Sequence, residues 1–479
     1  MMDVDEFFGA RAGFWDRSLA RLSLGLILRG ARIDPASEIP LAGVPSPLVP
    51  GLNLLERAKD GSRGTDLAGD GPGAPVIVGT VRMGFGHHRI AYSAHSWAIE
   101  KGMRPYLHDL IGIESQESDV IRRMDANYCR LSRLAADLGG PFDWVWGRLM
   151  QQGDLKTLRL FCRLAEAVAP LMRSLPKDVP VIGSHPLNSQ IAVACGFRHV
   201  INLVIDNYPQ YFVMAPGAIH LVQSPAHGMQ LVKMGLPQES VRYGGHWVSQ
   251  DVCANAAEDC ARRIERADRG APRRLLAPVG GAGAQGGFLT DLVKRLGPRL
   301  AEGKVRLLLN AGHHRHMRPA LERTLNEAGI EFDTVRTWSE LEEFCRVHTL
   351  SGSEPAGAKP AVLASFEDYF EAFSATDRLI RVSDVLVTKP SELAFYPIPK
   401  LHIRRVGGHE EPSAIRSSEL GDGSPECREP ADAERMAGLL VDDRHMFIRM
   451  NESIIRNSAA GVYSGGKTAV ELAAELSKV

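Results

Sequence analysis

The sequence predicts an α/β protein with two Rossmann-like domains, and two observations carry this prediction. A short β-branched run at 76–81 leads into a glycine turn and then into a helix that opens on His87. The same order of strand, glycine turn and helix returns at 275–287. This order brings titratable side chains and free backbone N–H groups to the carboxyl edge of a parallel sheet. We therefore expect two sheets whose edges share an interdomain cleft.

Composition predicts a chain of two or three domains and gives no sign of nucleic-acid binding or of a membrane span, since no run approaches about 18 apolar residues. The chain has 479 residues, enough for two or three domains, and a formal net charge of -1, which gives no reason to expect nucleic-acid binding. Its seven cysteines form no Cys-x-x-Cys pair, so neither a zinc site nor a disulfide framework is indicated. We expect a cytoplasmic protein without a metal or cofactor.

The first 72 residues predict an N-terminal helical extension followed by a linker. Between 7 and 31, aromatic residues and leucines alternate with arginines, a pattern typical of a helix on an anionic membrane surface. A helix docked on its own protein gives the same pattern and is the commoner case. Peripheral contact with the inner face of a membrane stays open as an alternative. Residues 32–74 are rich in Pro, Gly and Asp and predict an extended linker.

Alternating strands and helices place the first α/β domain at 73–250 and the second at 251–442. The C-terminal helical segment 443–479 is expected to pack back on the first domain. The strands that we expect are 76–81, 179–182, 200–205, 220–222, 275–279, 305–309, 385–387 and 401–403.

The first glycine turn is a candidate catalytic loop. Gly84 and Gly86 let the backbone turn tightly and approach a ligand, and His87 at the helix start can act as a general base near neutral pH. His88 follows directly. A surface loop with a solvent-facing histidine is the alternative interpretation.

Two more polar residues follow strands of the first domain. Asp206 comes after the run 200–205, so it could orient a histidine or simply cap its own loop, and the sequence leaves both interpretations open. His185 follows the strand at 179–182 and is a weaker candidate of the same kind.

The second glycine turn is a candidate diphosphate site. Its backbone N–H groups and the start of the next helix suit a pyrophosphate. A dinucleotide site also needs an acidic residue at the end of the next strand, and the segment 309–312 has none. We therefore expect a nucleotide diphosphate rather than NAD, which makes a dehydrogenase a distant alternative. The glycines concerned are Gly280, Gly281, Gly283, Gly286 and Gly287.

Two later loops should rise at the same edge of the second sheet. Lysine and serine side chains suit phosphate, and glutamate accepts hydrogen bonds from sugar or ribose hydroxyls. Two ordinary surface turns are the alternative. The candidate donor-binding residues here are Lys389, Pro390, Ser391, Glu392, Gly408, His409 and Glu410.

Two other motifs match only by letter. Residues 461–468 fit the P-loop pattern, but a helical pattern precedes them where a strand is required. The histidines at 313–316 are adjacent, so on a helix they do not share one face, and no carboxylate cluster accompanies them.

At these residues the chain resembles the inverting GT-B glycosyltransferases related to monogalactosyldiacylglycerol synthase and to the lipid I N-acetylglucosaminyltransferase of peptidoglycan synthesis. The resemblance covers roughly 75–440. It includes the glycine turn with its histidine, an aspartate after a mid-domain strand, the second glycine turn, a Thr-Lys-Pro segment at 388–390 and a late glutamate at Glu410. Two departures stand out. Ser391 and Glu392 replace a glycine pair, and prolines interrupt the following helix where the family carries an acid for the donor ribose, a role that Glu392 could take.

The resemblance implies a hexosyltransferase that moves a sugar from a nucleotide-sugar, such as a UDP-sugar, to an acceptor hydroxyl with inversion. It implies that His87, with Asp206, removes the acceptor proton. It places the acceptor, small or lipid-linked, near Gly84, Gly86, His88 and His185 of the first domain. The donor then belongs to the second domain. A nucleotide-sugar epimerase of the same architecture and an idle nucleotide-binding scaffold are the alternatives.

Overall fold

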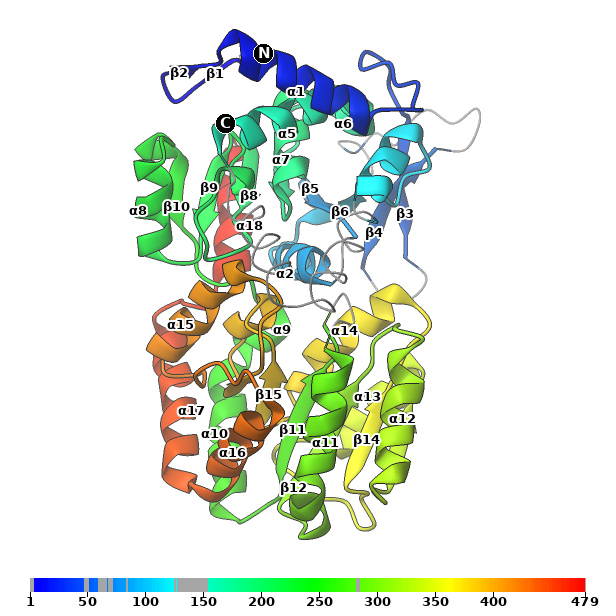
Figure 1. The fold of residues 1–479 in the computed structure, drawn as a ribbon, viewed down its shortest axis with the longest axis vertical. Helices are drawn as coiled ribbons and strands as arrows, with labels where there is room; N and C mark the ends of the chain where they lie inside the picture. Colours follow the sequence, from blue (N-terminus) through cyan, green and yellow to red (C-terminus); the bar gives the residue numbers. More distant parts are fainter. Residues whose placement is uncertain are drawn as a thin grey trace. The chain divides into compact units, whose positions relative to one another are not determined.

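The computed structural model describes residues 4–46, 51–58, 67, 72–82, 85–124, 126, 154–280 and 285–478. The chain forms two compact units, of which unit 1 comprises Met1–Gln250 and Ser464–Val479 and unit 2 comprises Asp251–Tyr463. Each unit is an α/β body built on a mainly parallel sheet (Figure 1). The prediction of two Rossmann-like α/β domains is confirmed, whereas the cleft between them stays a prediction.

Unit 1 is built on one large sheet. In the described part of the chain its strand order is β10-β9-β8-β7-β5-β6-β4-β3. Every neighbouring pair is parallel except β3 with β4. The strands of unit 1, with the separate β1–β2 hairpin, are β1 (Glu6–Phe7), β2 (Ala10–Arg11), β3 (Leu41–Pro45), β4 (Asn53–Arg57), β5 (Pro75–Thr80), β6 (Arg104–Asp109), β7 (Val181–Gly183), β8 (Val200–Leu203), β9 (Ile219–Val222) and β10 (Val241–Tyr243).

The chain reverses direction in the middle of this sheet. From β5 it steps to β6 on one side, and it then returns past β5 to β7 and continues outward. Because such crossovers are right-handed, the two directions put their helices on opposite faces. Accordingly α2 packs with α18, whereas α7 packs with α5. The crevice between β5 and β7 is the topological switch point, where open α/β sheets bind ligands.

The helices of unit 1 pack around its sheet. Of the segment 443–479, which was expected to pack on the first domain, α18 belongs to unit 1 and α17 belongs to unit 2. The helices of unit 1 are α1 (Phe14–Ile27), α2 (Gly86–Glu100), α5 (Leu155–Ala167), α6 (Pro170–Arg173), α7 (Pro186–Ala194), α8 (Pro225–Lys233) and α18 (Gly465–Leu476), with short 3-10 turns η1 (Tyr211–Val213) and η2 (Gln238–Ser240).

The prediction of a linker at 32–74 is wrong, because this segment contributes two strands to the sheet. β3 and β4 pair antiparallel, and β4 joins β6 in parallel. Leu41 and Leu55 of this hairpin are buried in the unit 1 core. Gly43 and Pro45, part of the composition that predicted a linker, lie within β3 itself, and burial of the leucines outweighs their low preference for a strand.

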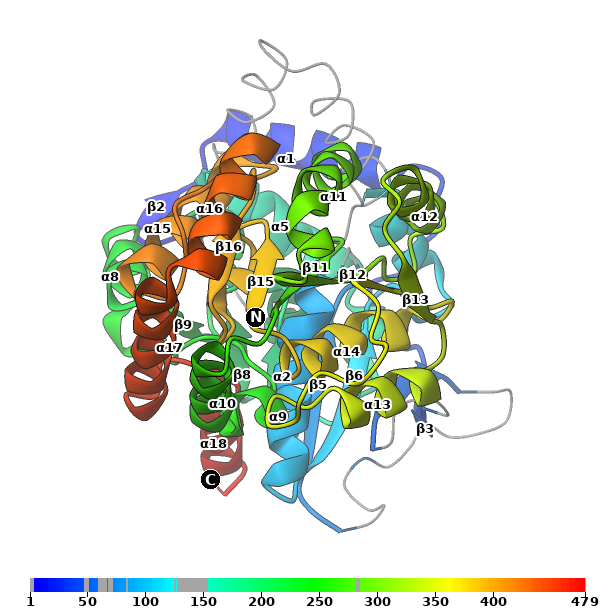
Figure 2. The same cartoon turned by 90° about the horizontal axis from the view of Figure 1, so that it is seen from below.

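Unit 2 repeats the plan with a smaller, parallel sheet. Among the described residues its order is β13-β14-β12-β11-β15-β16, so the chain reverses between β11 and β15. α11, α12 and α16 pack on one face, and α13 packs with α14 on the other (Figure 2). The strands are β11 (Arg273–Pro278), β12 (Val305–Asn310), β13 (Phe332–Val335), β14 (Ala361–Ala364), β15 (Val385–Thr388) and β16 (Lys400–His402).

Helices of unit 2 account for most of its remaining chain, and α10 packs along α17. The helices are α9 (Gln250–Ala254, which begins at the last residue of unit 1), α10 (Ala256–Asp268), α11 (Gly286–Ala301), α12 (Met317–Glu327), α13 (Trp338–Val347), α14 (Tyr369–Ile380), α15 (Glu411–Glu419), α16 (Pro430–Asp442) and α17 (Arg444–Ala459), with 3-10 turns η3 (Glu392–Phe395) and η4 (Gly408–Glu410).

All eight strands expected from the sequence are present, with ends that differ by up to two residues. Strands such as β6 were not anticipated, since Pro105 and polar residues interrupt its apolar pattern. None of the described helices has the length and hydropathy that crossing a membrane requires.

Candidate functional site

His87 lies at the switch point of unit 1, as the second residue of α2 after β5. Its Nδ1 is 3.2 Å from the carbonyl oxygen of Ser184, which follows β7. Because a carbonyl can only accept, Nδ1 carries the hydrogen and Nε2 keeps its lone pair in the neutral ring. The half-buried His87 is therefore held in the tautomer that can accept a proton.

His185 stands beside His87 and caps α7. Its Nδ1 accepts a hydrogen bond from the N–H of Leu187 at 3.0 Å, and the two histidine rings lie 4.5 Å apart at 67°. Burial, with a smaller contribution from His87, holds the pKa of His185 well below its usual value. A neutral His185 adds no positive charge beside His87 at neutral pH.

His88, an expected acceptor-side residue, is only 1% exposed. Its Nδ1 is 2.9 Å from the Thr80 hydroxyl, and its Nε2 is 3.9 Å from the carboxylate of Asp109. Burial, followed by Arg82 and His87, lowers the pKa of His88 well below its usual value. These contacts hold the buried His88 between the ends of β5 and β6.

Asp109 fixes the other side of the same loop. The carboxylate of Asp109 accepts the backbone N–H groups of Arg82 and Ile111, each at 3.2 Å, and pairs with the Arg82 guanidinium. Burial raises the pKa of Asp109, which Arg82 partly offsets. Sequence reasoning missed Asp109. An aspartate at the end of a strand beside a glycine turn could have indicated it as a candidate.

The structure gives fewer contacts for the other candidate residues of unit 1, which are Gly84, Gly86 and Asp206. Gly84 lies outside the described residues, and Gly86 begins α2. Asp206 is half-buried in the loop after β8, next to Asn207, whose side-chain oxygen accepts from Ser224 at 2.7 Å. Whether Asp206 assists His87 or caps its loop stays a prediction.

Two strand glycines also shape this crevice, and sequence reasoning missed them. A Cβ on Gly79 would lie 2.8 Å from Asn188, and one on Gly183 would lie 2.2 Å from the Ser189 hydroxyl. The glycines thus let α7 approach the ends of β5 and β7 closely. A glycine inside a strand marks such an approach and was the available signal.

Unit 2 places a lysine at the corresponding position. A Cβ on Gly280, after β11, would lie 3.3 Å from Cε of Lys389, after β15. The Lys389 ammonium pairs with the carboxylate of Glu410, which comes from the loop after β16 and is 4% exposed. Glu410 also accepts the N–H of Val406 at 2.7 Å. The loops that follow β11, β15 and β16 therefore meet around one cation, beside Gly280, at the switch point of unit 2.

α11 begins six residues after Gly280, the glycine that the Lys389 side chain approaches. Gly281 and Gly283 lie outside the described residues, whereas Gly286 and Gly287 form the first turn of α11. Gln285 caps the helix and donates to the carbonyl of Arg404. The first N–H groups of a sixteen-residue helix favour an anion at this edge.

His314 brings a fourth loop to the same edge, after β12. Burial, with smaller contributions from the nearby His313 and His316, lowers the pKa of His314 to about 4. A hydrogen bond with the backbone of Gly280 acts in the opposite direction and raises it. The ring is neutral at pH 7 and adds a hydrogen-bonding group rather than a charge. No set of three or more His, Cys, Asp or Glu side chains in the described ranges could hold a metal ion.

The other predicted donor-loop residues lie in the loops that follow β15 and β16. Pro390 is buried, and the N–H of Ser391 donates to the carbonyl of Lys389 at 2.8 Å. Glu392 begins the four-residue turn η3, which stops before Pro397 as the prolines predict. Gly408 and His409 are half-buried in η4, which ends at Glu410.

Comparisons with known proteins give domain matches without an assigned activity. Residues 55–230 match the family model "Domain of unknown function (DUF6937)", and residues 236–474 match "Domain of unknown function (DUF6938)". A search of curated proteins finds no match.

Solved structures of similar arrangement are all distant in sequence. UDP-GlcNAc 2-epimerase from Neisseria meningitidis, bound to UDP-GlcNAc, is 11% identical with a TM-score of 0.45, over 84% of this chain and 99% of that one. The α,α-trehalose 6-phosphate synthase of Burkholderia multivorans is 12% identical with a TM-score of 0.44, over 84% and 98%. Anabaena HepE with UDP and glucose is 11% identical with a TM-score of 0.42, over 85% and 100%. With TM-scores below 0.5, these similarities decide nothing about activity.

Proposed function

We propose that this chain is an inverting glycosyltransferase that moves a sugar from a nucleotide-diphosphate sugar to an acceptor hydroxyl. The observation that carries the proposal is the Lys389 ammonium, which lies against Gly280 at the unit 2 switch point and is held there by Glu410. A cation, a glycine turn and a helix N-terminus at one edge suit a diphosphate. Donor binding therefore belongs to unit 2, with UDP as the expected nucleotide.

Charge balance explains why these groups suit the leaving group. The bond from the anomeric carbon to the diphosphate breaks, so negative charge grows on the diphosphate oxygens in the transition state. Lys389 and the first N–H groups of α11 are fixed in advance and stabilise that charge without a metal ion. Ser391 and Glu392 follow Lys389 in the chain, and Glu410, with His409 before it, is brought to Lys389 by the ion pair, so these four residues are the candidates to contact sugar or ribose.

His87 is the proposed base on unit 1. The acceptor oxygen forms a bond to the anomeric carbon, and its proton passes to Nε2 of His87. The carbonyl of Ser184 holds the opposite ring nitrogen, so the proton-accepting nitrogen faces away from it. Asp206 remains the candidate to stabilise the resulting imidazolium.

The test is release of nucleoside diphosphate from a panel of nucleotide-sugars, with and without acceptors. We expect His87→Ala to lower turnover at least about 100-fold and to leave the thermal shift by nucleoside diphosphate unchanged. Lys389→Met should abolish that thermal shift. Undiminished turnover of the His87 variant overturns the assignment of the base, and absence of any shift with the unaltered protein overturns the donor site.

An epimerase is the second candidate, because Asp109 is a buried carboxyl of raised pKa at the carboxyl end of β6. Epimerisation relays protons between such groups and needs no acceptor. Interconversion of the donor alone, lost in Asp109→Asn, would favour it. Nucleotide binding without any turnover would instead favour an idle scaffold, in which the altered Ser391-Glu392 loop no longer supports chemistry.

A further inference from the structure

The helix α1 carries an apolar stripe that faces solvent. None of its residues is buried, and Trp15 is 81% exposed. The stripe repeats at helical spacing, so its side chains gather on one face. Its members are Trp15, Leu19, Leu22 and Leu26, with Phe14 beside them. Exposed apolar patches of this kind mark interaction surfaces.

The opposite side of α1 is already attached to unit 1. Asp16 pairs with Lys156 of α5 at 3.1 Å, and Leu24 and Ile27 pack against the unit 1 core. Figure 1 shows α1 lying across α5. The helix is therefore fixed by one side, and the exposed stripe is a second apolar face that folding of this unit does not use.

The segment that contains α1 is basic. Residues 11–32 contain five arginines, Arg11, Arg17, Arg21, Arg29 and Arg32, and a single acid, Asp16, which Lys156 neutralises. A basic helix with an exposed apolar face complements an anionic lipid surface. An apolar protein partner would cover the stripe equally well but would leave these guanidinium groups unmatched.

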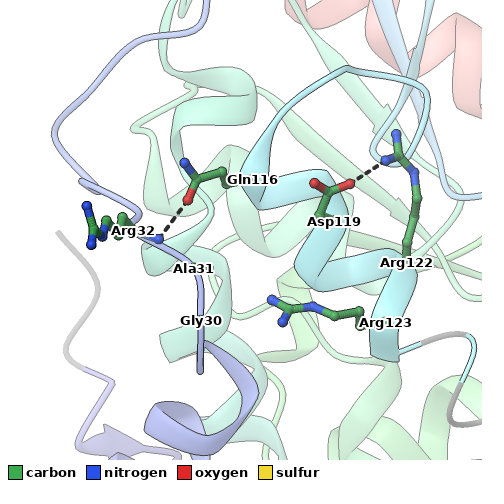
Figure 3. A pocket seen from close by; sticks show the side chains of 7 residues that line it. All are labelled: Gly30, Ala31, Arg32, Gln116, Asp119, Arg122 and Arg123. Carbon is green, nitrogen blue, oxygen red and sulfur yellow. Dashed lines mark hydrogen bonds and ion pairs between the residues drawn. The ribbon is translucent and has the colours of Figure 1, made fainter.

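A hollow lies where α1 ends. It has a volume of about 550 Å³ and is lined by Gly30, Ala31, Arg32, Gln116, Asp119, Arg122 and Arg123. Arg123 reaches toward the chain at Gly30 and Ala31 (Figure 3) and donates to the carbonyl of Arg29 at 3.0 Å. Arg122 pairs with the one acid of the hollow, Asp119. The Arg122 guanidinium also donates to the carbonyl of Ile111, so Arg32 and Arg123 are the two guanidinium groups of the hollow that suit a phosphate headgroup.

We propose that α1 and the arginine hollow at its C-terminal end form a surface that binds an anionic lipid bilayer. The apolar stripe enters the interfacial region, and the arginines contact headgroup phosphates. A fourteen-residue helix is about 21 Å long, too short for a bilayer core of about 30 Å. α1 therefore lies in the plane of the membrane. This proposal does not depend on the enzymatic activity.

The experiment is cosedimentation of the full chain with phosphatidylcholine vesicles, with and without phosphatidylglycerol. We expect binding only when the anionic lipid is present. The double variant Leu19→Ser/Leu22→Ser should lose at least about tenfold in affinity, and Arg32→Gln about fivefold. Both sets of changes lie on exposed positions, so folding should be unaffected.

Matched controls come from elsewhere in unit 1. Met229→Ser on α8 removes an apolar side chain that is 72% exposed, and Arg242→Gln removes an exposed arginine of β10. Neither should change binding. The proposal is overturned if the vesicles bind no protein, if both lipid mixtures bind equally, or if the double variant binds normally. It is also overturned if the chain self-associates through the stripe, seen as a dimer that the double variant abolishes while vesicles capture nothing.

Discussion

The two switch points share a topology but differ in chemistry. In unit 1 the crevice between β5 and β7 holds two neighbouring histidines, one fixed by a carbonyl and one that burial keeps neutral. In unit 2 the crevice between β11 and β15 holds the ammonium of Lys389, the carboxylate of Glu410 and Gly280. The comparison teaches that the topology fixes where the loops meet, whereas the loop residues decide which chemical groups meet there. The proposed function assigns proton transfer to the first set of groups and anion binding to the second.

The largest expected contrast between the units is their response to acid. Burial lowers the pKa of six histidines in unit 1, including His95, His220 and His227 to about 4. The others in unit 1 are His88, His108 and His185. In the described part of unit 2 only three histidines are lowered, namely His314, His348 and His402.

The sign follows from proton binding. Below pH 6.5 these histidines bind protons in the unfolded chain but not in the folded one, so acid favours unfolding until the folded pKa values are reached. In the described residues unit 1 has three more such histidines than unit 2. We therefore expect acid to lower the stability of unit 1 more than that of unit 2. Hydrogen exchange at pH 7.5 and 5.5, read by peptide, checks this, and a larger loss of protection in unit 2 would contradict it.

The second contrast concerns the ion pair of unit 2. Lys389→Met leaves the buried carboxylate of Glu410 without its partner, which should destabilise unit 2 by about 2 kcal/mol. The double variant Lys389→Met/Glu410→Gln should recover most of that stability without recovering nucleotide binding. Chemical denaturation and nucleoside diphosphate titration measure the two effects separately.

The control for this pair is Lys294→Met, since Lys294 pairs with Glu327 at 3.1 Å where both side chains are about half exposed. It should change stability by no more than about 0.5 kcal/mol. If the double variant bound nucleoside diphosphate as well as the unaltered chain does, Lys389 would have no part in the anion site.

The smallest contrast uses two threonines that end the central strands. Thr80→Val removes the hydroxyl that contacts His88, and Thr388→Val removes the one that donates to the carbonyl of Lys389. Each should cost about 1 kcal/mol of stability. We expect Thr80→Val to alter turnover but not nucleotide affinity, and Thr388→Val to alter affinity. If Thr80→Val altered nucleotide affinity and Thr388→Val altered turnover instead, the proposed assignment of proton transfer to unit 1 and anion binding to unit 2 would be wrong.

Sequence reasoning located much of both sites because their parts are local. A β-branched run, a glycine turn and a helix start lie within about fifteen residues, so periodicity alone found β5, β11 and the loops that follow them. The same reasoning failed for β3 and β4, whose short strands sit among turn-forming residues and depend on pairing with β6. It also did not foresee that His88 would be buried.

By itself, the sequence determined the order of strands and helices, the glycine turns, and which titratable residues follow which strands, because these depend on backbone preference and local spacing. Tertiary structure alone decided which groups meet, pairing His87 with Ser184 and Lys389 with Glu410. It also decided which face of α1 packs on unit 1 and which faces solvent. Such contacts join residues far apart in the chain, so they form only when parallel strands bring the loops to one edge.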